Sequence, residues 1–345
     1  MAEEGRGLLE RLDDGPVICA EGYLFELERR GYLQAGAFVP EVVLEHPEKV
    51  SELHREFVHA GSDIVEAFTY YAHREKLRLI GQEHLLERIN RQALELARQV
   101  ARESGALFAG NVCNTNVWTG EESRDTVRAM FEEQVGWALD AGAELIIGET
   151  FSWAGEAVVA TEVIKAAGVP AVITFAAHRE PETREGLTPA EACRAVEAAG
   201  ADVVGLNCSR GPATMLPLIA EIRDAVSVHV AALPVPYRTH AGEPSFQSLR
   251  DPRAEAPDER AFPTALDAFT CNRHEVARFA ADALALGARY LGLCCGAAPH
   301  HVRAMAEAVG RTPAASRYSA DMSKHAYFGT DAMLKAEYRQ YANKL

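Results

Sequence analysis

Three cysteines have the type and spacing that could hold a metal ion. Cys208 closes one apolar run of the chain, and Cys294 and Cys295 close another more than eighty residues later. Three thiolates suit zinc, and three protein ligands leave a fourth coordination position open, as in catalytic zinc sites. Because a metal-bound thiol is deprotonated and the thiolate is the nucleophile, we expect attack of a substrate thiolate on an electrophile such as an alkyl group.

The alternative interpretation is that these cysteines are buried core thiols, because free cysteine behaves as a small hydrophobic residue. We assign that structural role to Cys19, Cys113, Cys193 and Cys271. Neighbouring residues of a regular strand point to opposite faces, so Cys294 and Cys295 can share one ion only if the strand ends or bulges there. The glycine at position 296 favours such a departure.

The elements that must position these thiols alternate regularly along the chain. Short β-rich runs are predicted at residues 17–20, 63–71, 106–112, 145–149, 169–175, 202–208, 228–234 and 289–295. Helical periodicity is found at residues 46–60, 82–103, 124–141, 156–167, 189–199, 213–225, 274–286 and 299–309. Eight strand–helix repeats predict an α/β fold, a (β/α)8 TIM barrel, in which the carboxyl ends of all strands meet at one rim.

An open doubly wound sheet is the alternative fold, but the glycine-rich phosphate loop expected after its first strand is absent from the sequence. The barrel is expected over residues 1–311. Residues 234–263 are predicted to form a loop over the barrel mouth. Residues 312–345 are predicted to be a C-terminal extension, helical near 330–343, that packs on a neighbouring surface or subunit.

Composition excludes several classes of partner. The chain has 345 residues and a net charge of −15, which disfavours nucleic acid because phosphate binding needs clustered positive charge. No run of residues is long and apolar enough to span a membrane, and the first fifteen residues lack the apolar segment of a signal peptide. We therefore expect a cytoplasmic protein with reduced thiols.

At these residues the chain resembles the zinc-dependent homocysteine S-methyltransferases, and among them the betaine–homocysteine S-methyltransferases. The likeness covers almost the whole chain. It is carried by ERRGYLQAG at 28–36, FTYYAHREKL at the end of 46–76, IIGETF at 146–151, GLNC at 205–208, LPVPYRTH at 233–240 and YLGLCCG at 290–296.

The resemblance implies a function and roles for particular residues. A methyl group would pass from a betaine-like onium donor to homocysteine, giving methionine. Cys208, Cys294 and Cys295 match the zinc ligands, and Glu149 matches the carboxylate that holds the homocysteine amino group. Tyr71 matches a tyrosine of the betaine site that can also occupy the fourth metal position. The family also implies a homo-oligomer assembled through the C-terminal extension.

Two departures concern the substrate sites. Ala20 stands where the family has an aspartate that helps to bind the acceptor ammonium, and Glu21 is the nearest available carboxylate. Phe38 and Thr150 replace a tryptophan and a tyrosine of the family's donor pocket. The remaining candidates for substrate binding are three rings expected near the rim and the residue before Cys208: Tyr70, Tyr71, Trp118 and Asn207.

Other functions remain open on this sequence. The altered donor pocket could suit a sulfonium donor, such as S-methylmethionine or a dimethylsulfonium compound. The missing aspartate could indicate another thiol, or a selenol, as acceptor. A zinc-binding protein without turnover is a further alternative.

Overall fold

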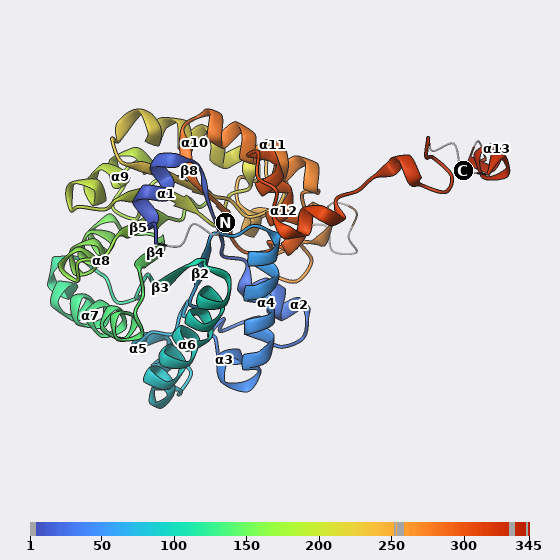
Figure 1. The fold of residues 1–345 in the computed structure, drawn as a ribbon. Coiled ribbons are helices and arrows are strands. Elements are labelled where there is room, and N and C mark those ends of the chain that lie inside the picture. The colour runs from blue at the N-terminus through green and yellow to red at the C-terminus, as the bar shows by residue number, and fades with distance from the viewer. Residues whose placement is uncertain (1–4, 252, 254–258, 331–334, 343) are drawn as a thin grey trace.

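The computed structural model describes residues 5–251, 253, 259–330, 335–342 and 344–345. Within them, eight parallel strands close into a barrel in sequence order, with the last strand pairing with the first (Figure 1). The strands are β1 Val17–Ala20, β2 Ile64–Glu66, β3 Leu107–Cys113, β4 Leu145–Phe151, β5 Ala171–Phe175, β6 Val203–Asn207, β7 His229–Leu233 and β8 Ala288–Leu293. The predicted (β/α)8 barrel is confirmed.

Helices surround the barrel (Figure 1). They are α1 Leu8–Asp14, α2 Tyr23–Arg29, α3 Val42–Glu45, α4 Pro47–Ala60, α5 Arg74–Leu79, α6 Leu86–Ser104, α7 Arg124–Ala141, α8 Ala154–Ala166, α9 Pro189–Ala198, α10 Pro212–Ala225, α11 Arg273–Ala285, α12 Pro299–Ala308 and α13 Ala336–Ala342. The eight predicted barrel helices are confirmed, and a short 3-10 turn, Glu83–Leu85, precedes α6. Glycine in the left-handed conformation ends several of them, as at Gly61 and Gly142.

The barrel interior is an apolar core of its own. Inward-facing side chains such as Leu145, Ile147 and Val203 are buried there. Leu8 and Leu12 of α1, a helix that the sequence pattern did not predict, belong to the same cluster. Because α1 packs below the strands, this end of the barrel is closed, and the rim at the carboxyl ends of the strands remains for chemistry.

The second strand is shorter than predicted. We expected a strand over 63–71, but β2 ends at Glu66 and the chain then turns. Tyr71 adopts the left-handed conformation, with φ of +58°. The aromatic run after β2 extended the strand-like pattern past the point where the backbone leaves the sheet. Tyr70 and Tyr71 therefore lie on the rim loop.

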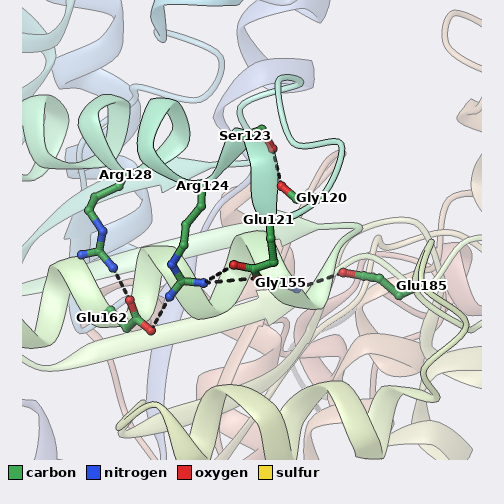
Figure 2. A network of polar contacts seen from close by, with 8 residues as sticks. All are labelled: Gly120, Glu121, Ser123, Arg124, Arg128, Gly155, Glu162 and Glu185. Atoms are coloured by element: carbon green, nitrogen blue, oxygen red, sulfur yellow. Dashed lines mark hydrogen bonds and ion pairs between the residues drawn. The ribbon is translucent and has the colours of Figure 1, made fainter.

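Polar contacts join the outer helices on the side of α7 and α8 (Figure 2). The Glu162 carboxylate of α8 accepts hydrogen bonds from Arg124, at 2.7 Å, and from Arg128, both on α7. Arg124 also contacts Glu121, and the Glu185 carboxylate accepts from the Gly155 N–H at the start of α8 at 2.9 Å. These carboxylates are paired with cations or with helix N–H groups at the surface.

After α12 the chain leaves the barrel. The segment from 312 contains the 3-10 turns Ala314–Tyr318 and Met322–Lys324 and then α13, which projects away from the barrel in Figure 1. The helix predicted at 330–343 is observed as α13, and 331–334 and 343 lie outside the described residues. No helix among the described residues has the length and apolarity needed to cross a membrane.

Candidate active site

The three cysteines predicted as metal ligands meet at the barrel rim. Cys208 follows the last residue of β6, and Cys294 and Cys295 follow β8, so all three lie just beyond the strands rather than in them. Their sulfur atoms lie within 4.8 Å of one another, and the Sγ atoms of Cys294 and Cys295 are 3.9 Å apart. The sequence predicts that Cys294 and Cys295 can share one ion only if the strand ends or bulges there, and β8 does end at Leu293.

Gly296 makes the turn after the paired cysteines possible. Its φ is +94°, and a Cβ built at this position would lie 2.3 Å from the Tyr237 hydroxyl oxygen. A side chain is thus disfavoured both by the backbone conformation and by the space available. The chain can therefore turn directly after Cys295 and direct both neighbouring thiols to the same point.

The sulfur atoms influence one another's protonation. Hydrogen bonds from the thiols of Cys294 and Cys295 lower the pKa of Cys208 well below that of a free thiol. The hydrogen bond with Cys208 is the main cause that raises the pKa of Cys294 and of Cys295. One negative charge is thus stabilised among three sulfur atoms, and the cluster is a candidate metal site of soft ligands.

A bulge in β4 presents two successive side chains to the same cavity. The pairing of β4 with β5 shifts between Gly148 and Phe151, and Thr150 has φ of +62°. A regular strand would direct Glu149 and Thr150 to opposite faces, but the bulge brings both to the wall of one cavity. A left-handed β-branched residue is strained by roughly 1–3 kcal/mol, so this geometry must be held by its neighbours.

Asn207 supplies that support. Its amide oxygen accepts from the Thr150 N–H at 2.9 Å, and its amide nitrogen donates to the Glu149 carboxylate at 2.8 Å and to the Thr150 hydroxyl at 2.9 Å. Asn207 is fully buried. The sequence predicts a substrate-binding role for Asn207, and its hydrogen bonds to Glu149 and Thr150 also allow it to position the bulge.

A second asparagine, which the sequence analysis missed, joins two carboxylates. Asn111 of β3 donates from Nδ2 to Glu66 at 2.6 Å and to Glu149 at 2.8 Å. Burial raises the pKa of Glu149 to about 7, against the lowering effect of the Asn111 hydrogen bond. Burial, and after it the charge of Glu149, raises the pKa of Glu66 well above its ordinary value.

Glu21 reaches the same place from the end of β1. Because β1 ends at Ala20, the alternation of a strand no longer applies to Glu21, whose side chain lines the cavity. Neither of its carboxylate oxygens has a hydrogen-bond partner among the described residues. Burial, and after it the charge of Glu66, raises the pKa of Glu21 well above its ordinary value.

Two cavities meet at the cysteines. The deep cavity is lined by Glu21, Tyr23, Leu24, Glu66, Ala67, Phe68, Tyr70, Asn111, Glu149, Thr150, Cys208, Cys294 and Cys295. The outer cavity is lined by Leu24, Phe25, Phe38, Tyr70, Tyr71, Asn114, Thr150, Ser152, Ala176, His178, Cys208, Ser209, Phe246, Gln247, Phe262 and Cys295. Because Cys208 and Cys295 line both, the sulfur cluster forms part of the wall between them.

Six phenylalanine and tyrosine rings contribute to the lining of the outer cavity. The ring of Phe25 on α2 lies 6.0 to 6.2 Å, centroid to centroid, from those of Phe38, Phe246 and Phe262, each in an edge-to-face arrangement. Phe38 was predicted here, whereas Phe25, Phe246 and Phe262 were missed. The last two belong to the loop predicted to cover the barrel mouth, so that prediction could have pointed to them.

Two predicted aromatic residues behave differently from expectation. Tyr71 lines the outer cavity, but its ring contacts two other side chains. The ring centroid lies 4.2 Å from that of Tyr70 and 4.5 Å from Nζ of Lys76. Trp118 lies away from both cavities, because its ring packs against Gly155 of α8. The structure therefore does not bring Trp118 to the other site residues.

Left-handed backbone is concentrated at this rim. Six described non-glycine residues have positive φ, and five of them line one or both cavities: Phe38, Tyr71, Thr150, Cys208 and Ser209. Such conformations cost about 1–3 kcal/mol each and persist where the surroundings enforce them. Their concentration at the cavities indicates that side-chain placement here is maintained at the expense of stability.

Comparison with known proteins gives a consistent result. The profile of the homocysteine S-methyltransferase family matches residues 18–309. Betaine–homocysteine S-methyltransferase 1 of Danio rerio is 36% identical over 337 residues, covering 94% of this chain and 80% of that protein. An S-methylmethionine–homocysteine S-methyltransferase of Pongo abelii is 33% identical over 309 residues, covering 88% of this chain and 81% of that protein.

Solved structures show the same fold. The homocysteine methyltransferase MmuM from Escherichia coli, in its metallated form, matches with a TM-score of 0.66 at 19% identity. The match covers 86% of this chain and 97% of that chain. The oxidized form of the same protein matches with a TM-score of 0.67 at 20% identity. At these identities the likeness concerns the barrel fold.

Proposed function

Because the chain belongs to the homocysteine S-methyltransferase family, we propose that it moves a methyl group from an onium donor of the betaine type to the sulfur of homocysteine, giving methionine. Methyl transfer to homocysteine is the activity of this enzyme. The proposal adds the metal, the residues and the donor class. It rests above all on the three sulfur atoms in the wall between an acidic cavity and an aromatic one.

Zinc is the metal that the sulfur cluster fits. Zinc–sulfur bonds of about 2.3 Å in tetrahedral geometry place two ligand sulfur atoms about 3.8 Å apart. The Cys294 and Cys295 sulfur atoms are 3.9 Å apart, and all three lie within 4.8 Å. When bound, zinc lowers the pKa of a substrate thiol so that it reacts as a thiolate. Cys208, Cys294 and Cys295 would hold it.

The two cavities divide the substrates. The deep cavity, with its carboxylates, suits the ammonium of the acceptor, and Glu149 is held in place for this by Asn111 and Asn207. The outer cavity suits a cationic methyl donor, because aromatic ring faces attract onium groups by about 0.5–2 kcal/mol each. Tyr70 and Thr150 line both cavities and would adjoin both substrates.

The reaction is a direct displacement. The acceptor sulfur, having lost its proton, forms a bond to the methyl carbon, while the bond from that carbon to the donor nitrogen or sulfur breaks. The electron pair of the broken bond stays on the departing amine or sulfide, which thereby becomes neutral. Holding both substrates at near-attack distance supplies much of the rate, and the aromatic cavity excludes water from the cation that is discharged.

A sulfonium donor is the second candidate. Phe38 and Thr150 make the outer cavity different from the donor pocket that the betaine-specific resemblance implies, and one relative of similar identity carries S-methylmethionine in its name. A panel of glycine betaine, S-methylmethionine and a dimethylsulfonium compound, each with homocysteine and the zinc-loaded protein, decides between them by methionine formation. Methionine from none of these donors would refute the proposed function.

We also propose that residues 1–311 form the catalytic barrel and that 312–345 mediate self-association. Large apolar side chains of this extension are exposed, among them Tyr318, Phe328 and Tyr341. All seven cysteines are free thiols, which suits a reducing compartment such as the cytoplasm. Light scattering of the full chain and of a chain ending at 311 tests the proposed self-association. We expect a smaller assembly for the shortened chain.

A further inference from the structure

Three buried carboxylates face one another in the deep cavity. Glu21, Glu66 and Glu149 are 7%, 2% and 6% exposed. The carboxylate of Glu21 lies within 4.8 Å of Glu66 and of Glu149, since it belongs to two clusters of mutually close side chains, one with Cys19 and Glu66 and one with Glu149 and Cys294. Glu66 and Glu149 share the amide nitrogen of Asn111.

The walls of the deep cavity do not compensate this negative charge. The described residues that line it include no lysine, arginine or histidine. Both oxygens of Glu21 are buried and lack a partner in the described part of the chain. Buried charges in proteins are normally paired or bound to a cation. The arrangement therefore has the electrostatic character of a site that receives a positively charged group.

The spacing fits an ammonium. An alkylammonium has three N–H donors, and charge-assisted hydrogen bonds place carboxylate oxygens about 2.8 Å from the nitrogen. Two oxygens bound at a tetrahedral angle are then about 4.6 Å apart, a separation that the pairs including Glu21 allow, since their oxygens lie within 4.8 Å. The three N–H donors of one ammonium match three carboxylates. Glu66 lies in β2, Glu149 lies in β4 and Glu21 directly follows β1.

We propose that Glu21 and Glu66 are specificity-determining residues that, with Glu149, bind the ammonium group of the acceptor. Recognition of the acceptor then depends more on its ammonium group than on its carboxylate. This inference rests on the proposed function and adds two contacts to it, of which Glu66 has no assigned role. The sulfur of Cys294 lies within 4.8 Å of the Glu21 and Glu149 carboxylates, so a short aminothiol can reach the carboxylates and the sulfur cluster together. An acceptor carboxylate, by contrast, meets three acidic side chains and no basic side chain among the described lining residues.

A panel of three acceptors tests this with the zinc-loaded, full-length protein. Homocysteine is compared with 4-mercaptobutanoate, which lacks the amino group, and with 3-aminopropane-1-thiol, which lacks the carboxylate. We expect kcat/KM to fall about 10- to 100-fold on loss of the ammonium and less on loss of the carboxylate. A greater fall on loss of the carboxylate overturns the proposal.

The variants Glu21→Gln and Glu66→Gln keep the shape of the side chains and remove their charge. We expect each to lower kcat/KM for homocysteine about 10-fold or more, with little change for 4-mercaptobutanoate and with unchanged or higher thermal stability. Glu156→Gln is the control, because Glu156 is equally buried, at 1% exposure, but is bound by Thr115 and does not line the cavity. An unchanged preference among acceptors in both cavity variants overturns the proposal.

Metal analysis distinguishes an ammonium site from a second metal site. We expect one equivalent of zinc per chain in the wild type and in Glu66→Gln. A second equivalent that disappears in Glu66→Gln would identify the carboxylates as metal ligands and overturn the proposal. Calorimetric binding of homocysteine and of 4-mercaptobutanoate is measured in parallel, so that the preference for the ammonium is tested even if no methyl transfer is observed with any donor.

Discussion

Carboxylates of this protein occur in two contrasting settings. Glu162 of α8 contacts Arg124 and Arg128 (Figure 2), and its side chain is 35% exposed. Glu21 and Glu66, inside the barrel mouth, are buried and contact no basic side chain among the described residues. Basic side chains thus accompany the partly exposed carboxylate and are absent, in the described part of the chain, beside the two buried ones, whose pKa burial raises well above the ordinary value. The difference indicates that the outer carboxylates serve the fold and the inner ones serve a ligand.

Removing a thiolate from the inner region should have the largest effect. Cys208→Ser takes one of three soft ligands from the cluster, so we expect loss of bound zinc and a fall in methyl transfer of more than about 1000-fold. Cys193→Ala, which removes a buried thiol of α9 that lines neither cavity, is the control and should retain the metal. Retention of stoichiometric zinc in Cys208→Ser would show that another ligand set holds the metal.

The second largest effect is expected on neutralising Glu149, the inner carboxylate that Asn111 and Asn207 hold in place. Glu149→Gln should lower kcat/KM for homocysteine about 100-fold, because a charge-assisted hydrogen bond to the acceptor is lost. Its free energy of unfolding should fall modestly, because Asn111 and Asn207 donate to different oxygens of Glu149 and the amide of glutamine can accept only one of these hydrogen bonds. Steady-state kinetics and denaturant unfolding measure the two effects. A large loss of stability with little loss of activity would assign Glu149 to the fold and remove the contrast with Glu162.

The outer cavity offers a third setting, because we propose that it binds a cation and its described lining residues include no carboxylate. Phe246→Leu removes a ring that lies 4.9 Å from Phe262 and 6.1 Å from Phe25. We expect KM for the onium donor to rise about 5-fold, as for loss of one cation–π contact, with KM for homocysteine unchanged. Equal changes in both KM values would mean that the two cavities do not divide the substrates.

The smallest effect is expected at the surface. Glu162→Gln weakens ion pairs that are solvated and screened, so the free energy of unfolding should fall by only about 0.5–1 kcal/mol, and less at high salt. Methyl transfer should not change. Denaturant unfolding at low and high salt, together with activity, provides the measurement. A loss of activity in this variant would contradict the assignment of the outer carboxylates to the fold.

Sequence reasoning was most successful where residue type and strand position coincide. Periodicity predicted the eight strands and their helices, and Cys208 was recognised because it lies at a strand end, whereas Glu149 was identified through the family resemblance. Glu66 was overlooked inside the run DIVEAF, although a carboxylate closing a buried strand is itself a signal.

The remaining features depend on contacts between distant segments. Phe25, Phe246 and Phe262 come from a helix and a long loop, and local patterns do not predict which rings meet. The β4 bulge depends on Asn207, more than fifty residues away in the chain, and Thr150 carries none of the glycine signal that usually marks a left-handed residue. Trp118 was misplaced because position along the chain says little about the direction of a loop.

The left-handed residues at the rim have a consequence for how the enzyme fails on heating. Thr150, Cys208 and Tyr71 are held in unfavourable conformations by a few hydrogen bonds, while the opposite end of the barrel is closed by an apolar plug. The rim should therefore open locally at a free energy below that of global unfolding. Amide exchange would be fastest there, and catalysis would be lost on warming before the secondary structure melts.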